Sequence, residues 1–95
     1  MKVLLNSTAA AETGASYAMQ DAEATGTNIV QVDFDGGTGT VVIEGRVSES
    51  LEWVPFLTVT ASDDLLNEIV AVPYIRAVSS GYSQTGDLQV ALARS

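Results

Sequence analysis

The sequence predicts an all-β fold, a small antiparallel β-sandwich of jelly-roll or immunoglobulin-like type with about six or seven strands. Apolar and polar residues alternate in several short runs, and turn-forming segments separate these runs at regular intervals. No stretch has the apolar stripe of a helix. At 95 residues the chain is expected to form one domain, residues 1–95, just large enough to bury a single core.

The N-terminal segment, residues 1–27, is predicted to be rich in loops. Residues 3–5 are expected to form a short first strand, and a second short strand is expected around residues 15–19. Between them the composition is dominated by Ala, Ser, Thr and Gly. An alternative interpretation stays open, in which residues 6–26 are an arm that orders only against a partner.

The clearest predicted hairpin covers residues 28–47. Every second residue from Val30 to Phe34 is apolar, so these side chains share one face of a strand. The glycine-rich residues 35–39 are expected to turn the chain, because glycine adopts positive φ angles without a steric penalty. Residues 40–47 then repeat the alternation and form the second arm.

The remaining strands surround the two prolines of the chain. Residues 53–61 read as a strand in which Pro55 indicates a sheet edge or a bulge, because proline cannot donate to the ladder. Residues 67–94 are predicted to form a second hairpin. Its first arm, up to Val78, contains Pro73 and is therefore expected to have a bulge or to border an edge; its second arm alternates from Leu88 onward.

The charge balance limits the possible partners. Twelve acidic residues against four basic ones leave a net charge of −8, which would repel nucleic acid and anionic membranes. We therefore expect neither as a partner. The chain has no cysteine, so it has no disulfide framework and no thiolate metal site. Its first residues are too poor in apolar side chains for a signal peptide, so we expect the chain to be cytosolic when it is made.

The residues that usually carry enzyme chemistry are scarce. The chain has no histidine and no cysteine, so the commonest general base and the commonest thiol nucleophile are missing. Asp33 and Asp35 share one strand face, but no bidentate glutamate follows at the spacing that a calcium loop needs. We therefore predict no catalytic residue, no metal site and no cofactor, and a function that is not enzymatic.

Five residues are candidates for an interface or a structural role: Trp53, Pro73, Tyr74, Arg76 and Tyr82. Trp53 has apolar neighbours and is expected to anchor the core between the sheets. Arg76, on the same strand face as Tyr74, is expected to pair with a carboxylate such as Glu44 or Glu68. Tyr82 stands in a polar turn, where an exposed ring could stack on a sugar or on a neighbouring subunit.

Three segments carry a resemblance to a known family: TVVIEGRVSES, LEWVPF and VPYIRAVSSGYSQTGDLQVALA. They are similar to the pattern of small virion structural proteins of tailed bacteriophages. In that pattern a strand leads through a polar turn to a tryptophan, here Trp53, and a Pro-Tyr-apolar-Arg-Ala strand, here residues 73–77, precedes a glycine turn and a last alternating strand. The resemblance covers the chain from Asn28 onward. The chain departs from the pattern at Glu49-Ser50, where an Asp-Gly turn is usual.

The resemblance implies a β-sandwich on the capsid surface of the virion. Such a decoration or cement protein bridges neighbouring subunits of the major capsid protein, often as a homo-trimer or another homo-oligomer. A flexible arm, residues 6–26, would order across a neighbour, so its deletion is expected to abolish attachment and to leave the sandwich folded. The alternatives are a neck or tail component of the virion and a carbohydrate-binding β-sandwich that uses Tyr82 or Trp53.

Overall fold

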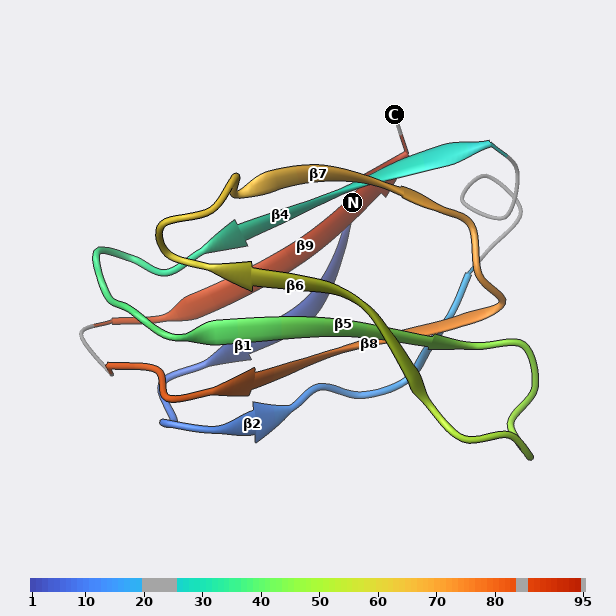
Figure 1. The fold of residues 1–95 in the computed structure, drawn as a ribbon, viewed down its shortest axis with the longest axis horizontal. Helices are drawn as coiled ribbons and strands as arrows, with labels where there is room; N and C mark the ends of the chain where they lie inside the picture. Colours follow the sequence, from blue (N-terminus) through green and yellow to red (C-terminus); the bar gives the residue numbers. More distant parts are fainter. Residues whose placement is uncertain (20–25, 84–85, 95) are drawn as a thin grey trace.

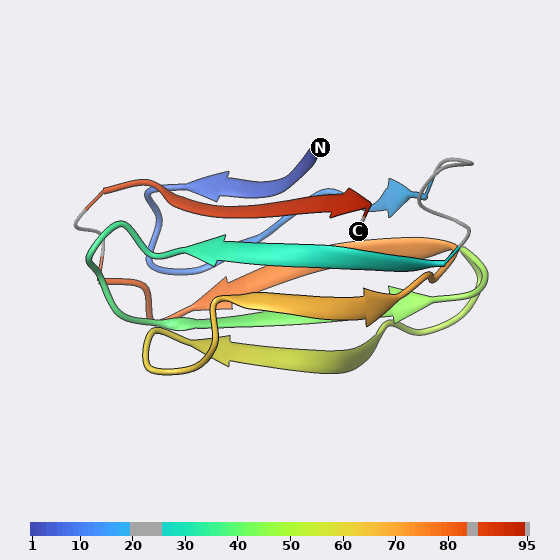
Figure 2. The same cartoon turned by 90° about the horizontal axis from the view of Figure 1, so that it is seen from above.

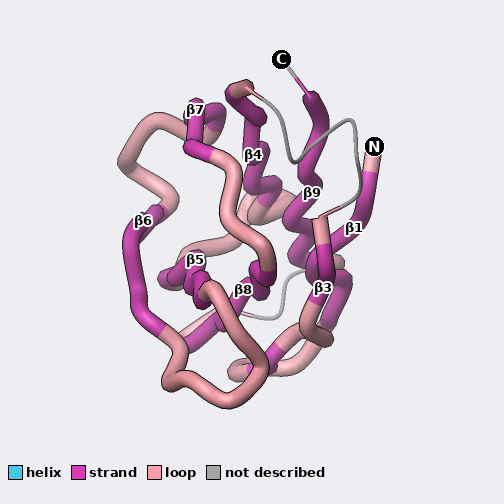
Figure 3. Tube along the Cα trace, turned by 90° about the vertical axis from the view of Figure 1, so that its right-hand side faces the viewer, coloured by secondary structure: helices cyan, strands magenta, loops and turns pink. Residues whose placement is uncertain are grey.

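The computed structural model describes residues 1–19, 26–83 and 86–94, and in these ranges it contains nine strands and no helix. The strands form two antiparallel sheets that lie one above the other in Figure 3. The prediction of an all-β sandwich is confirmed. The strands outnumber the expected six or seven because the two-residue strand Glu12–Thr13 is too short for an alternation to reveal, and because the expected arm up to Val78 is divided into two strands, Leu66–Val70 and Tyr74–Ser80. Nothing in the described ranges is a helix that could span a membrane.

The two sheets contain four and five strands. Sheet A has the spatial order β1 (Lys2–Ser7), β9 (Leu88–Arg94), β4 (Thr27–Asp33) and β7 (Leu66–Val70). Sheet B has the order β2 (Glu12–Thr13), β8 (Tyr74–Ser80), β5 (Thr40–Arg46) and β6 (Val54–Thr60), and β3 (Tyr17–Ala18) pairs with β8 on the same side as β2. The edge strands β6 and β7 therefore lie together at one side of the sandwich (Figure 3).

The connections make the fold a jelly roll. If β2 and β3 are taken as one interrupted strand, every connection except that between β5 and β6 passes from one sheet to the other. Strands equally far from the middle of the chain pair with each other: β1 with β9, β2 and β3 with β8, β4 with β7, and β5 with β6. The chain is thus a long hairpin, folded at residues 47–53 and rolled into two sheets, as Figures 1 and 2 show.

Both predicted hairpins are wrong in their pairing, although most of their strands are in the right place. Residues 28–47 supply β4 to sheet A and β5 to sheet B. The turn between them forms, with positive φ at Asp35, Gly36 and Gly39, but it leads the chain across the sandwich. Residues 67–94 are divided in the same way among β7, β8 and β9. Alternation shows which face of a strand is buried. It does not show which strand pairs alongside, because the same apolar face results whether the next strand lies in the same sheet or in the opposite one.

The two prolines have different roles. The prediction for Pro55 is confirmed, because β6 is an edge strand and its register against β5 shifts between Ile43 and Glu44. Ile43 pairs with Leu57 and Glu44 with Pro55, so Phe56 is the extra residue of a bulge. Pro73 is not within a strand. It lies in the connection from β7 to β8, where its missing N–H leaves no ladder bond unmade.

The core lies between the sheets and contains the residues that the alternation placed on the inner faces. These are Val30, Val32, Phe34, Val41, Ile43, Leu88, Val90 and Leu92, all of them buried. Each such aliphatic or aromatic side chain contributes about 1.5–3 kcal/mol to stability through its burial. The faces of β4, β5 and β9 are therefore predicted correctly, even where the partners of these strands are not.

The N-terminal segment is part of the sandwich. β1 pairs with β9, and its Leu4 and Leu5 belong to the core. Gly14 donates its N–H to the carbonyl oxygen of Ala77 at 2.8 Å, and a Cβ at Gly14 would collide with the carbonyl oxygen of Leu4. The predicted flexible arm is therefore wrong for residues 6–19, because small side chains let this segment pack closely on its own chain. Residues 20–25 lie outside the described residues.

Candidate interface at one end of the sandwich

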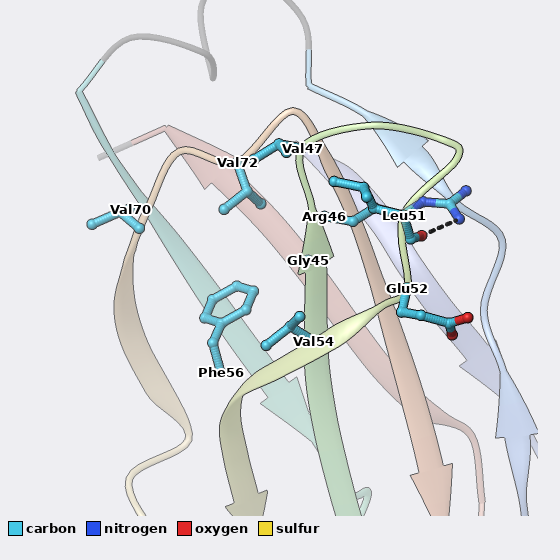
Figure 4. Close-up of a pocket in the computed structure, with 9 residues that line it drawn as sticks. All are labelled: Gly45, Arg46, Val47, Leu51, Glu52, Val54, Phe56, Val70 and Val72. Atoms are coloured by element: carbon cyan, nitrogen blue, oxygen red, sulfur yellow. Dashed lines mark hydrogen bonds between the residues drawn. The ribbon is translucent and has the colours of Figure 1, made fainter.

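An apolar pocket of about 370 Å³ opens at the end of the sandwich where β5 enters the loop of residues 47–53. Figure 4 shows that its walls come from both sheets, with Val70 on β7 and Val54 and Phe56 on β6. The pocket is lined by Gly45, Arg46, Val47, Leu51, Glu52, Val54, Phe56, Val70 and Val72. Its position places an opening into the apolar interior beside the two edge strands.

The pocket exists because β5 has a glycine on its inner face at this point. Gly45 continues the inward series of Val41 and Ile43 but brings no side chain. A Cβ at Gly45 would lie 3.0 Å from Cε1 of Phe56 and 3.2 Å from Cγ2 of Val72. The bulge in β6 directs the Phe56 ring over this glycine, and the ring fills only part of the space.

The walls of the pocket continue into an exposed apolar surface. Its five members, which we call the apolar end, are between 39% and 68% exposed: Val47, Leu51, Val54, Phe56 and Val70. Single exposed apolar residues are ordinary on a protein surface, whereas a contiguous group of them around a concavity is typical of an interaction site. The apolar end is therefore the candidate functional site of this molecule.

A cluster of one tryptophan and two arginines holds the loop that carries part of the apolar end. The Cζ atoms of Arg46 and Arg76 lie 4.2 and 4.5 Å from the centroid of the Trp53 ring. Cation–π contacts of this kind are worth about 0.5–2 kcal/mol each. Arg46 also donates from Nη1 to the carbonyl oxygen of Leu51 at 3.3 Å (Figure 4). These contacts order the loop before any partner binds, which lowers the entropy cost of binding.

The cluster extends to a neighbouring ion pair. Arg76 Nε lies 2.6 Å from Oε1 of Glu44, across from it on β5, so the predicted pairing of Arg76 with a carboxylate is confirmed for Glu44. The Tyr74 ring lies 6.0 Å from the Arg46 guanidinium. The structure thus brings together Trp53, Tyr74 and Arg76, and Pro73 directly precedes Tyr74 in the chain.

The prediction that Trp53 anchors the core between the sheets is wrong. The side chain is only partly buried and does not belong to the core. It stacks instead on Arg46 and Arg76, which extend from the outer face of sheet B, where alternate residues of β5 and β8 are half-buried. The guanidinium planes supply the packing partners that the aromatic ring would otherwise find among apolar side chains.

The prediction that Tyr82 is exposed is also wrong. Its side chain is 3% exposed, and its hydroxyl lies 3.0 Å from the carbonyl oxygen of Phe34 and 2.9 Å from that of Gly86. Its backbone N–H donates to the carbonyl oxygen of Ala10. Tyr82 therefore closes the end of the sandwich opposite the pocket. The polar residues next to Tyr82 in the sequence are typical of an exposed turn, so they gave no sign that its ring is buried.

Sequence reasoning missed most of the apolar end. Val47 and Leu51 interrupt a polar loop, where apolar side chains are unusual. This was the available signal for an exposed site. Val54 and Val70 gave no signal, because an apolar residue in a strand is normally interpreted as part of the core.

The pocket is better suited to contact than to chemistry. Its lining is apolar apart from Arg46 and Glu52, and within the described residues no three His, Cys, Asp or Glu side chains are grouped to hold a metal. No protein family model, curated protein or solved structure matches the chain. The resemblance to virion structural proteins therefore stays a prediction.

Proposed function

We propose that this protein is a non-enzymatic structural protein of a bacteriophage virion, which docks on a neighbouring virion protein through its apolar end. The expected role is that of a capsid decoration or cement protein, with the major capsid protein as partner. The observation that carries the proposal is the exposed apolar surface around the pocket. Covering such side chains contributes about 1.5–3 kcal/mol for each that becomes fully buried.

Two further features support the proposal. The jelly roll recurs in viral capsid proteins, although it also occurs in lectins and therefore supports the role only at the level of fold. Charged residues make up only 17% of the chain, so little charge has to be desolvated when neighbouring subunits cover the surface. Homo-trimers or other homo-oligomers on the particle are part of the proposal.

The test is the copy number of the chain in purified particles of the phage that encodes it, measured by quantitative mass spectrometry. A ratio near one chain per major capsid subunit would support the decoration role. A few copies per particle would support the neck or tail alternative. Absence from the particles would overturn the virion proposal.

A variant can link the copy number to the apolar end. We expect Val47→Asp with Leu51→Asp to lower the affinity for the particle about 100-fold, because two exposed apolar side chains lose about 3 kcal/mol of burial on docking. Thr58→Asp is the matched control, since Thr58 is exposed on β6 and does not line the pocket. Equal loss of binding in both variants would show that another surface docks.

The carbohydrate-binding alternative has no support from these side chains. It relied on Tyr82 or Trp53 as a platform for a sugar ring. Tyr82 is buried, and the Trp53 ring already stacks on two guanidinium groups. We therefore do not propose it.

A further inference from the structure

The four edges of the two sheets differ in how well they are protected against an added strand. The register of β1 shifts between Val3 and Leu5, β2 and β3 are two residues long, and β6 has Pro55 and a bulge. Short strands, prolines and bulges are the usual devices that prevent edge pairing. β7 has none of these. Its five residues pair with β4 in an unbroken register.

Alternate N–H and C=O groups of β7 point away from β4, where they can pair with an added strand. Val32 donates its N–H to the carbonyl oxygen of Leu65 at 2.9 Å, which continues the register between β4 and β7. Hydrogen-bonded pairs alternate along an antiparallel ladder, so Asn67 and Ile69 bond inward to β4. The N–H and C=O groups of the three alternate residues therefore point away from β4: Leu66, Glu68 and Val70. No strand of the described part of the chain pairs on that side.

The side chains of these three residues form an apolar–acidic–apolar row. Leu66 is 61% and Val70 66% exposed, and Glu68 is exposed between them. Val70 also lines the pocket, so the edge of β7 is continuous with the apolar end.

The charge of this row decides which kind of strand fits it. A second copy of the chain, pairing antiparallel about Glu68, would place two carboxylates directly opposite each other, which is destabilising. Each copy also carries a net charge of −8. An opposite charge across from Glu68 is favourable for the same reason.

We propose that β7 accepts an extended segment of a partner protein as a fifth strand of sheet A. The segment has a lysine or arginine opposite Glu68 and apolar side chains beside Leu66 and Val70. Backbone hydrogen bonds supply affinity in this mode, and the alternate side chains supply specificity. The inference deepens the proposed function and rests on it only for the source of the segment, a virion protein.

The probe is the peptide acetyl-Thr-Val-Thr-Lys-Thr-Val-Thr-amide, which presents Val, Lys and Val on one face of a strand. We expect its titration into the ¹⁵N-labelled full chain at low salt to shift the amide signals of Leu66, Glu68 and Val70 more than those of Asn67 and Ile69. The same peptide with Glu in place of Lys is expected to bind about tenfold more weakly, because the exchange both removes an opposite-charge pair and creates a like-charge pair with Glu68. Equal binding of both peptides, or shifts spread over the whole surface, would overturn the proposal.

A pair of charge-reversal variants separates the site from the general attraction of a cation to an acidic protein. Glu68→Lys is expected to weaken the binding of the lysine peptide and to strengthen the binding of the glutamate peptide. Asp87→Lys makes the same change of charge at an exposed position outside β7. It is expected to leave the preference for the lysine peptide over the glutamate peptide unchanged. An equal effect of both variants would show that only net charge matters, and would overturn the proposal.

Failure of this inference can be told apart from failure of the proposed function. Peptide binding at β7 together with absence from particles would overturn the virion role and keep the acceptor edge. Full copy number in particles, with no peptide binding and no effect of Glu68→Lys on attachment, would keep the virion role and overturn the acceptor edge. A dimer of the free chain whose dissociation on dilution shifts the β7 amide signals would also overturn it, because the occupant would then be a second copy.

Discussion

At the scale of single residues, the hydroxyl of Tyr82 joins two segments that are far apart in the chain. It lies 3.0 Å from the carbonyl oxygen of Phe34, which follows β4, and 2.9 Å from that of Gly86, which precedes β9. Removing it would leave a buried carbonyl without this partner. We expect Tyr82→Phe to lower the free energy of unfolding by about 1 kcal/mol, measured by urea denaturation.

Tyr74→Phe is the matched control for this prediction. It removes the same atom from a half-buried ring whose hydroxyl makes no hydrogen bond within the described residues, while the contact of the ring with Arg46 stays. Its effect is expected to be within about 0.5 kcal/mol. Equal losses in the two variants would contradict the role assigned to the Tyr82 hydroxyl.

Asp63 stabilises the turn after β6. The backbone N–H of Thr60 and, second, its hydroxyl donate to the carboxylate, each at 2.9 Å, and they lower the pKa of Asp63 below its ordinary value of 3.8. We expect Thr60→Val to raise the pKa of Asp63 only part of the way back, because the backbone donor, the larger cause, remains. An NMR titration of the Asp63 carboxyl carbon measures this shift.

The lowered pKa also determines the direction of the pH dependence. The folded state stabilises the ionised carboxylate of Asp63 relative to the unfolded state. The full contribution of this carboxylate to folding stability is therefore present above the unfolded pKa. It is lost as the pH falls below about 3.8 through the folded pKa. Asp63→Asn should therefore flatten this part of the pH dependence of unfolding; an unchanged dependence would contradict the assignment.

At the scale of elements, β1 forms one edge of sheet A and part of the core. It covers one edge of β9 and contributes Leu4 and Leu5 to the core. We expect Leu5→Ala to lower the free energy of unfolding by about 2–5 kcal/mol, measured by chemical denaturation, because it leaves a cavity. Val3→Ala, on the same strand at a 44% exposed position, is the control and should cost much less.

Removal of residues 1–7 tests the same element as a whole. It would uncover β9 and the core beneath β1, so we expect the truncated chain to lose its cooperative thermal transition. A truncated chain with an unchanged Tm would instead show that β1 is dispensable for the fold.

At the scale of the whole molecule, the net charge of −8 works against compaction. We expect Tm to rise by a few degrees between about 20 and about 200 mM NaCl, because salt screens the repulsion among surface charges. The rise should be smaller in Glu49→Gln with Asp87→Asn, which removes two exposed acids. An equal rise in this variant would attribute the effect to something other than net charge.

The jelly roll also explains why the apolar end is where it is. The chain folds back at residues 47–53, so this loop, the edge strand β6 and the edge strand β7 meet at one end of the sandwich. Two edges and an opening into the core thereby lie next to each other. Docking at the apolar end and strand addition at β7 would cover one continuous surface.

Alternation and turn signals are enough to predict the fold class, most of the strand positions and their buried faces. Alternation places Val30 and Val32 on one buried face, and the missing N–H places Pro55 at an edge or a bulge, because both signals act within a few residues. The sequence also predicts that Arg76 pairs with a carboxylate, but it leaves Glu44 and Glu68 open, and the strand register decides for Glu44.

Strand pairing and the positions of the aromatic residues follow from the folded chain as a whole. The alternation of β4 and β5 is compatible with pairing in one sheet and with packing in opposite sheets. The two strands lie in opposite sheets, although the turn between them forms as expected. Trp53 lies outside the core and Tyr82 inside it because each has a partner from a distant part of the chain, the Arg76 guanidinium for Trp53 and the Phe34 carbonyl oxygen for Tyr82. The pocket likewise depends on Gly45 lying beneath Phe56 and Val72, a contact across the sandwich that no local pattern specifies.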